Sequence, residues 1–397
     1  MTLDRALEIS YSNSIELKTE KTTIDKALGR ILSEDIISHV NDPIFDNSAM
    51  DGWAVRIEDC KIGSRLKIIG TSQAGKNSPQ TVSKGEACRI MTGAPIPKGA
   101  NSILIIEKSE EDNGFVTILD NPKPNYIRKK GENITIGQTI LQSGTVLNPP
   151  EISLAATSGN WEVNVVKKPI VSIISTGDEL THPSSELNEG EIFESNSFGL
   201  TALIDKIGGK AENFGHISDS LEDLRNTLNL ASEKSDLIIT SGGVSMGEWD
   251  LVRKIMEEEG EIKFWKIKMR PGGPPLFGKW KETPLFGLPG NPVSSHVVFT
   301  MIVFPWVSFS LGFNTEKGPK LAEKVNVILK NSLKGAPGKV CLRRIKITNE
   351  NGILKATTNT HQGSGNINSM VVHNGLSLLP PNKDGKSGEI IEALWLR

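Results

Sequence analysis

Acidic side chains follow three apolar runs of the chain, where they could bind a divalent cation. Asp178 and Glu179 follow IIST, Asp219 follows FGHIS, and Asp250 closes SGGVSMGEWD. Because the carboxyl ends of parallel strands meet at one edge of a sheet, we expect these carboxylates to converge. Magnesium prefers oxygen ligands, so Glu179, Asp219 and Asp250 are the predicted metal ligands. The alternative for Asp219 and Asp250, taken singly, is a helix cap.

Glycines in the same loops leave room for a phosphate. Gly177 precedes the first acidic pair, and Ser241, Gly242 and Gly243 end the run LIITSGG. Small residues at such positions let a phosphate or a ribose approach the main chain closely. The alternative is a pair of tight strand-to-helix turns.

A second group of side chains is cationic. Lys266, Lys268 and Arg270 alternate in FWKIKMRPGGPP, and Arg343 and Arg344 follow later in VCLRRI. Alternation puts the first three on one face of a strand, where like charges are unfavourable unless they are solvated or face an anion. Two interpretations stay open, namely an oxyanion or phosphate site and an exposed edge strand.

The turn FGLPGNPVSS leads into an apolar segment, residues 292–311, that is about long enough to cross a bilayer. Ser294 and the backbone amides at its start would lie at the positive end of a helix dipole, which attracts anions. A rigid turn that only sets the helix direction is the alternative. The serines, His296 and Pro305 within the segment favour a buried helix over a membrane span.

Two polar loops lie near the amino end. Asp51 lies in DPIFDNSAMDGWAVR, and Thr92 lies in RIMTGAPIP. Both stand where the pattern of the chain changes, and clefts between domains are favoured ligand sites, although solvated loops are the alternative. The sequence contains no P-loop, GxGxxG or HExxH motif and its six histidines are scattered, which disfavours NAD chemistry and nucleophilic hydrolysis.

The chain is long enough to need several domains to position these groups, because 397 residues exceed the usual size of one core. Its net charge of -2 predicts neither a nucleic-acid nor a membrane partner. The three cysteines lie far apart, which disfavours a disulfide framework or a thiolate zinc site and fits a reducing cytoplasm. The first residues lack the apolar centre of a signal peptide.

Strand-like and helical runs alternate along residues 170–240. This alternation predicts a doubly wound, mostly parallel α/β sheet. Short β-type runs between residues 41 and 142 predict a small β unit, and a β-rich block at 325–397 carries the hairpin signal NENG. Helical spacing at 3–10 and 24–37 predicts short amphipathic helices. We therefore expect a multidomain α/β plus β protein.

Seven motifs stand in order along the chain: DNSAMDG (46–52), MTGAPIP (91–97), GEN (131–133), STGDEL (175–180), SGGVSMGEWD (241–250), LPGNPVS (288–294) and HQGSG (361–365). This set resembles the signatures of the molybdopterin molybdenumtransferases, MoeA-like proteins that are similar to the E domain of gephyrin. The resemblance covers nearly the whole chain.

The resemblance implies an elongated chain of four domains that forms a homodimer. The expected bounds are 1–40 with 141–167 for an extended helical domain, 41–140 for an inserted β domain, 168–313 for a molybdopterin-binding-like α/β domain, and 314–397 for a C-terminal β-barrel-like domain. The implied activity is insertion of molybdate into adenylylated molybdopterin with magnesium-dependent release of AMP. The adenylyltransferase of the same pathway and acceptor molybdoenzymes are further expected partners.

The resemblance also assigns roles to single residues. Glu179, Asp219 and Asp250 match the acidic group that holds magnesium and the pterin phosphates, with Asp178 beside them. Further matches are Asp51 and Thr92 in the inserted domain, facing the cleft with a partner subunit, Lys266 near the pterin, and Arg270, Ser294, Arg344 and Ser364 around the molybdate.

Two positions depart from the family pattern. Gly273 stands in RPGGP where the family commonly has a lysine, for which Lys268 is a candidate substitute, and Asn133 stands where it often has an aspartate. These departures leave open a tungstate-inserting paralogue. A molybdopterin-binding scaffold without turnover is a second alternative, and an enzyme acting on another nucleotide, such as a pyrophosphatase, is a third.

Overall fold

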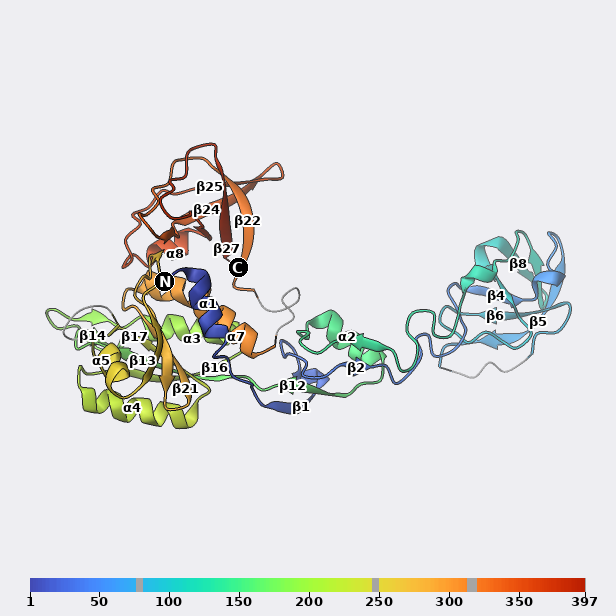
Figure 1. The fold of residues 1–397 in the computed structure, drawn as a ribbon. Helices are drawn as coiled ribbons and strands as arrows, with labels where there is room; N and C mark the ends of the chain where they lie inside the picture. The colour runs from blue at the N-terminus through green and yellow to red at the C-terminus, as the bar shows by residue number, and fades with distance from the viewer. Residues whose placement is uncertain (76–80, 245–249, 313–319, 397) are drawn as a thin grey trace.

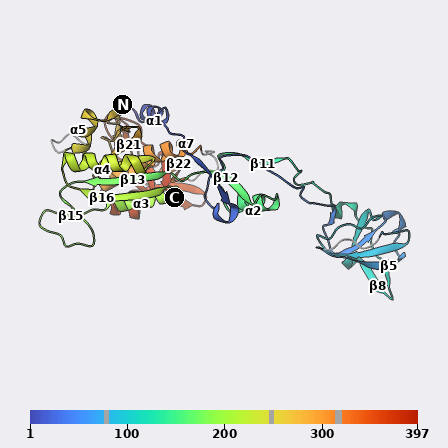
Figure 2. The ribbon, with the colours of Figure 1, turned by 90° about the horizontal axis from the view of Figure 1, so that it is seen from below.

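The computed structural model describes residues 1–75, 81–244, 250–312 and 320–396. The molecule is elongated: an α/β domain carries the C-terminal domain on one side, and an extended segment leads from it to a separate β domain at the far end (Figures 1 and 2). The chain runs out to that far domain and then returns beside its outgoing part. Strand β1 (Thr19–Thr23) on the way out pairs antiparallel with β12 (Glu162–Val166) on the way back. The expected multidomain architecture of α/β plus β is confirmed.

The α/β domain is built on a six-stranded sheet whose first four neighbouring strands are parallel. The fifth strand is antiparallel to the fourth, and the sixth is antiparallel to the fifth. Its two central strands are buried on both faces, which accounts for their continuous apolar runs. In spatial order the strands are β16 (Lys210–Ile217), β13 (Ile170–Thr176), β17 (Leu237–Ser241), β21 (Thr283–Leu288), β20 (Leu276–Trp280) and β18 (Glu261–Trp265).

Helices cover both faces of this sheet, as the alternating pattern predicts. Ile173 and Ile239 pack on one face against α3 (Asn196–Lys206) and the long apolar helix, whereas Ile174 and Ile238 pack on the other face. The opposite face carries α4 (Leu221–Lys234) and α5 (Leu251–Glu258).

The long apolar helix consists of α6 (Pro292–Val298), a π-type turn (Phe299–Val303) and α7 (Phe304–Ser310). By length and composition it is apolar enough to cross a membrane, yet 56% of its most apolar stretch is buried inside the protein. Its valine, phenylalanine and tryptophan side chains belong to the largest core cluster of the α/β domain. The expectation of a buried helix agrees with this packing.

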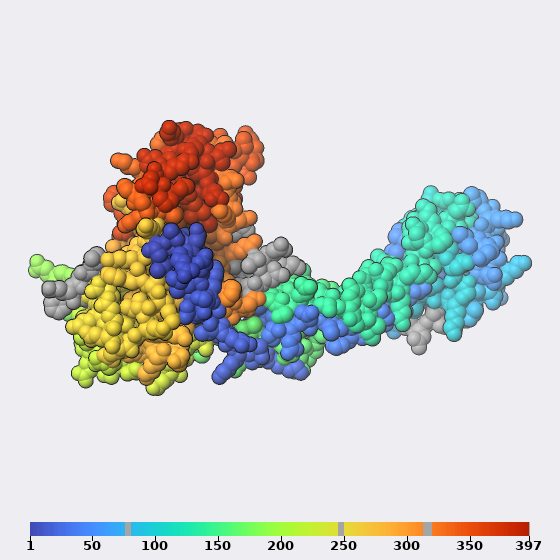
Figure 3. Space-filling view, viewed as in Figure 1, coloured from blue at the N-terminus to red at the C-terminus, as the bar shows by residue number. Residues whose placement is uncertain are grey.

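The amino-terminal helix α1 (Leu3–Tyr11) lies against the α/β domain (Figure 3). Its contacts are with α7 and β18, and the ring of Tyr11 stacks on Phe309 at 4.8 Å between centroids. The expected domain boundary at residue 40 groups α1 with the extended segment, whereas its apolar side chains join the α/β core.

The extended segment has its own small core around Leu32 and Val165. It contains α2 (Pro149–Thr157) and the pair β2 (Ile36–Ile37) with β11 (Thr139–Leu141). The predicted helix over 24–37 is wrong: only Ile24–Lys26 form a 3-10 turn. Gly29 has a positive φ of 73°, and the amides of Gly29 and Leu32 donate to residues 147 and 145 on the returning strand, so long-range pairing replaces helical bonds.

The far domain is a six-stranded β unit, as predicted for this region. Its strands in spatial order are β7 (Ser102–Ile105), β4 (Gly52–Val55), β6 (Glu86–Ile90), β5 (Arg65–Ser72), β9 (Phe115–Ile118) and β8 (Ser109–Asp112).

The C-terminal domain is a closed five-stranded barrel, which confirms the β-barrel-like expectation. The NENG hairpin forms between β24 (Arg344–Glu350) and β25 (Ile353–Thr357), with Asn351 and Gly352 both at positive φ. The other strands are β22 (Ala322–Leu329), β26 (Gly375–Ser377) and β27 (Ile390–Leu396). A short parallel pair, β19 (Met269–Arg270) with β23 (Val340–Cys341), ties the barrel to the α/β domain.

Candidate active site

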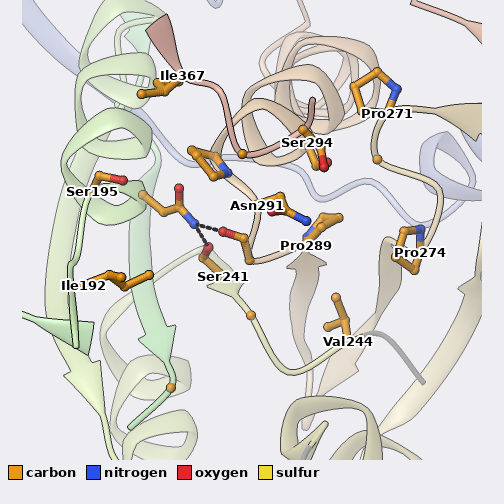
Figure 4. A pocket seen from close by; sticks show the side chains of 18 of the residues that line it. Ile192, Ser195, Ser241, Val244, Pro271, Pro274, Pro289, Asn291, Ser294 and Ile367 are labelled. Carbon is orange, nitrogen blue, oxygen red and sulfur yellow. Dashed lines mark hydrogen bonds between the residues drawn. The ribbon is translucent and has the colours of Figure 1, made fainter. Parts of the chain in front are cut away.

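A cavity of about 980 Å³ opens at the carboxyl ends of β13, β17 and β21. From β13 the chain crosses to β16 on one side and then returns to β17 on the other. The cavity therefore lies where the strand order reverses, the usual ligand position in open α/β sheets. Its opposite side is closed by residues 362–365 and by Arg343 and Arg344 of the barrel domain. We call this cavity the main pocket (Figure 4).

One wall of the main pocket is acidic. Glu179, Asp219 and Asp250 all line it, so the structure brings the three predicted metal ligands to one wall. Asp178 stands behind them, where its Oδ1 accepts from the backbone amide of Asp219 at 2.9 Å. The pKa of Asp219 is raised, first by burial and then by the negative charges of Asp178, Glu179 and Asp250.

These carboxylates do not form a closed metal cage by themselves. Among the residues that the structure describes, no group of three His, Cys, Asp or Glu side chains is close enough to hold an ion. The carboxylate of Glu179 folds back onto the main chain, with Oε2 only 2.4 Å from where a Cβ on Gly177 would lie. The side chain of Glu179 could move aside, so the φ of 145° at Gly177 is what favours glycine at this position.

The floor of the pocket is formed by the turn after β17. Ser241, Gly242 and Gly243 line it as predicted, and Gly242 has a φ of 98°. A Cβ on Gly242 would lie 2.7 Å from the carbonyl oxygen of Thr176, so only glycine fits this close approach of two strand ends. The remainder of this motif, residues 245–249, lies outside the described residues.

Asn196, the first residue of α3, also lines the pocket, although it belongs to none of the predicted site groups. Its Nδ2 donates to Ser241 Oγ and to the carbonyl oxygen of Gly290, both at 2.7 Å (Figure 4). The amide thus ties the pocket floor to the LPGNP turn. Its Oδ1 is buried and has no hydrogen-bond partner within the described ranges.

Glu194 is a second residue that the sequence did not single out. It is buried at the pocket wall, where its carboxylate accepts from Ser175 Oγ at 3.0 Å and from the backbone amide of Ser197 at 2.8 Å. Ser197 Oγ donates to its second oxygen at 2.5 Å. A buried carboxylate with these donors fixes the start of α3 beside the pocket.

The opposite wall is basic and lies at the joint between two domains. Arg270 comes from the α/β domain, Ser294 from the first turn of α6, and Arg344 and Ser364 from the barrel. The joint is held by main-chain bonds, because the amide of Val293 donates to Ser364 O at 3.1 Å.

Arg344 is the centre of this wall. Only 1% of it is exposed, and its guanidinium donates to Ser369 Oγ and to the carbonyl oxygen of Gly363, each at 3.0 Å. None of the ion pairs found within the described ranges includes it. Burial, with help from the charge of Arg343, lowers its pKa to about 10, so it stays charged at neutral pH. A buried cation with neutral acceptors suits an anionic ligand.

Comparisons with known proteins agree on one family. The MoeA N-terminal region (domain I and II) matches residues 1–159, a probable molybdopterin binding domain matches 172–308, and the MoeA C-terminal region (domain IV) matches 326–396. The molybdopterin molybdenumtransferase of Haemophilus influenzae is 35% identical over 396 residues, 98% of this chain and 97% of that protein. The chain belongs to the molybdopterin molybdenumtransferases.

Other molybdopterin molybdenumtransferases extend the match. Molybdopterin molybdenumtransferase 2 of Mycobacterium tuberculosis is 33% identical over 341 residues, 83% of each chain. Two structures of the molybdopterin biosynthesis MoeA protein of Pyrococcus horikoshii, 32% and 28% identical, match 100% of this chain and 99% of their own with a TM-score of 0.85. The motif resemblance is thus confirmed, and the chain is a transferase of molybdenum cofactor biosynthesis.

Two sets of predicted site residues lie outside the main pocket of this molybdenumtransferase. Asp51 and Thr92 belong to the far β domain, where Asp51 Oδ1 accepts from the amide and the hydroxyl of Thr92 at 2.7 and 3.1 Å. Lys266 and Lys268 line a neighbouring cavity, which shares Arg270 with the main pocket.

The predicted single strand face of Lys266, Lys268 and Arg270 is wrong. Strand β18 ends at Trp265, and Lys266 has a positive φ of 67°, which breaks the alternation. Strand pairing resumes only at β19, with the barrel instead of the sheet. The two lysines therefore belong to the connection between β18 and β19, and Arg270 belongs to β19.

The raised pKa of Asp219 predicts a pH-dependent stability. Because the folded state favours the protonated form, folding is helped below the unfolded pKa of about 3.9 and this help is lost as the pH rises through the folded value. We expect the urea concentration at the midpoint of unfolding to be higher for Asp219→Asn than for the wild type at neutral pH, and this difference to shrink near pH 4.

The control is Glu110→Gln, an exposed change of equal charge in the far domain. It should show no such pH-dependent gain in urea midpoint. An Asp219→Asn protein that is no more stable than the wild type at neutral pH would contradict the crowding of carboxylates at this wall.

Proposed function

We propose that the main pocket binds adenylylated molybdopterin, cleaves its pyrophosphate link by attack of water with release of AMP, and inserts molybdate at the two pterin sulfurs, with the displaced oxide leaving as water. The observation that carries this proposal is the pairing of two walls across one cavity: three carboxylates on one side and buried Arg344 with Arg270 on the other. A cation–phosphate complex suits the first wall, and an oxyanion suits the second.

The acidic wall suits a magnesium ion that is held by one or two carboxylates together with substrate phosphates. Glu179, Asp219 and Asp250 supply hard oxygen ligands, and burial together with the neighbouring negative charges raises the pKa of Asp219. Because these side chains do not close around an ion alone, one or two of them would share it with substrate phosphates and water. The ion would supply charge neutralisation at the pyrophosphate during AMP release.

The floor and the basic wall orient the reactants. Ser241, Gly242 and Gly243 leave the main chain open to a phosphate, and Asn196 holds this turn against the LPGNP turn. Arg270, Arg344, Ser294 and Ser364 would hold the tetrahedral molybdate dianion. Charge-assisted donors from two domains fix its position next to the pterin sulfurs, so that positioning carries much of the catalysis.

We include a homodimer in the proposal because Asp51 and Thr92 lie at the far end of the elongated chain (Figure 1). A second copy would bring its far domain to this pocket, with Lys266 near the pterin. On the same family grounds, the enzyme works in the cytoplasm, receives its substrate from an adenylyltransferase and delivers cofactor to acceptor molybdoenzymes.

Release of AMP tests the reaction. Purified protein with adenylylated molybdopterin, magnesium and molybdate should release AMP, measured by chromatography, and Asp250→Ala should slow this at least about a hundredfold, because a charge-positioning group is lost at the reacting phosphates. Glu110→Gln is the control of equal charge change. No AMP from the wild type, or an Asp250→Ala rate equal to it, would refute the proposal.

Molybdate binding tests the basic wall. A ligand at a hundred times its Kd stabilises a protein by about 2.7 kcal/mol, so molybdate should raise the melting temperature of the wild type. Molybdate should raise the melting temperatures of Arg270→Gln and Ser364→Ala by less, because each change removes a donor to the oxyanion. The melting temperature of Arg65→Gln, a change in the far domain, should rise as much as that of the wild type. The idea is lost if both pocket variants respond to molybdate fully, and a parallel titration with tungstate measures metal preference.

Mixed dimers test the contribution of the partner. Asp51→Ala and Asp250→Ala should each be inactive alone, whereas subunits mixed in equal amounts should regain about a quarter of wild-type activity, since half of the dimers then contain one intact site of two. If the pocket used Asp51 of its own chain, mixing would restore nothing. The measurement is AMP release after exchange of subunits, with dimer formation followed by light scattering.

A further inference from the structure

The short helix α8 (Asn368–Val372) lies where the barrel meets the α/β domain (Figure 1). Ile367, the residue before it, lines the main pocket, and Figure 4 shows its side chain there. Met370 packs against the core cluster of the α/β domain, and Ser369 is fully buried. The helix is therefore fixed against both domains, although none of its residues belongs to the predicted site groups.

Ser369 contacts the guanidinium of Arg344 as an acceptor. Its Oγ accepts from Arg344 Nε at 3.0 Å. The hydroxyl proton of Ser369 is donated elsewhere, to the carbonyl oxygen of Asn366 at 2.6 Å. Because a hydroxyl has one proton and two lone pairs, this second bond leaves only lone pairs of Ser369 to face the cation. The turn that leads into α8 thus fixes the direction of the bond between Arg344 and Ser369.

His373 follows the last residue of α8, and only 6% of it is exposed. Its Nδ1 lies 2.8 Å from the carbonyl oxygen of Ser369. A carbonyl oxygen only accepts, so Nδ1 carries the proton and donates it. The last carbonyl groups of a helix have no partner within the helix. The ring of His373 therefore caps α8 at the residue that holds Arg344.

The two anchors of Arg344 leave part of its guanidinium unused. Nε donates to Ser369 and Nη2 donates to the carbonyl oxygen of Gly363, whereas Nη1 makes no hydrogen bond within the described residues. A guanidinium has five N–H donors in one rigid plane, so two fixed bonds also fix the direction of the other donors. Arg344 lines the main pocket, where these other donors are available to a ligand.

We propose that α8 is a positioning unit of the main pocket, in which Ser369 and His373 hold Arg344 so that its free N–H groups bind the tetrahedral anion. The inference rests on the proposed function, because it takes this anion to be molybdate. Ser369 and His373 are positioning residues, since neither lines the pocket. A carboxylate in place of the Ser369 hydroxyl would neutralise the guanidinium, whereas the hydroxyl fixes its plane and leaves its charge for the ligand.

Molybdate binding to the full chain, measured by calorimetry, tests Ser369. Ser369→Ala removes the acceptor of Arg344 Nε and should weaken molybdate binding at least about fivefold, because the guanidinium keeps only one of its two anchors. The matched control is Ser158→Ala. Ser158 is also a buried serine that donates one hydrogen bond and accepts another, but it lies in the extended segment. Molybdate affinity of this control should equal that of the wild type.

A pair of substitutions tests His373 while Ser369 stays in place. His373→Asn keeps an N–H donor for the carbonyl oxygen of Ser369 and should bind molybdate about as tightly as the wild type. His373→Leu has a similar volume without a donor and should weaken binding at least about threefold. Circular dichroism checks that each variant folds, and this pair decides the question if Ser369→Ala does not fold.

The AMP assay supplies a readout that a purely structural role would not give. In Ser369→Ala the KM for molybdate should rise while the KM for adenylylated molybdopterin stays at the wild-type value, because α8 acts on the anion alone. An equal rise of both KM values would assign Ser369 a general structural role and overturn the inference.

Unchanged molybdate affinity in both Ser369→Ala and His373→Leu would also overturn the inference, as would an equal loss in Ser158→Ala or a wild type that binds no molybdate. If molybdate binds and its affinity falls in the α8 variants but no AMP is released, the proposed reaction fails and the positioning role of α8 stands. If AMP is released and the α8 variants bind molybdate like the wild type, the reaction stands and this inference fails.

Discussion

The guanidinium of Arg344 is buried at the joint between the barrel and the α/β domain, and its charge has to be accommodated there. Its hydrogen bonds go to Ser369 and Gly363, which are neutral. Gln362 also bonds the main chain of Arg344 in both directions, at 2.9 and 3.1 Å. These contacts hold the HQGSG loop in place within the barrel domain, and the amide of Val293 donates to Ser364 O at 3.1 Å, which docks this loop on the start of α6. The loop that docks one domain on the other therefore also shapes the basic wall of the pocket.

The acidic wall is the counterpart of this constraint. Burial and the neighbouring carboxylates raise the pKa of Asp219, and Arg344 is a buried cation that forms no ion pair among the described residues. Both features are electrostatically unfavourable, and both belong to one cavity of about 980 Å³. A ligand with a cation–phosphate part and an oxyanion part would relieve both, which connects the stability of the fold to the proposed chemistry.

The elongated shape limits what one chain can assemble. The extended segment has a small core around Leu32 and Val165, and it carries the far β domain away from the main pocket (Figure 2). Asp51 and Thr92 are hydrogen-bonded to each other there, in a different domain from the acids of the main pocket. The proposed homodimer would bring the two groups together.

The sequence by itself determined the parts that depend on local pattern. Alternating apolar runs specified the doubly wound sheet, and the residues that follow each run specified the glycine loops and the acids at the strand ends. Side-chain periodicity and turn chemistry act over only a few residues, so the sequence encodes both directly. The cationic pattern pointed to Arg344, whereas the family resemblance supplied its role beside molybdate and the choice of Ser364. Tertiary structure decided the rest: residues 24–37 pair with a distant strand, Lys266 leaves its strand, and Asn196 and Glu194 join the pocket. Each depends on partners remote in sequence, which short-range periodicity does not encode.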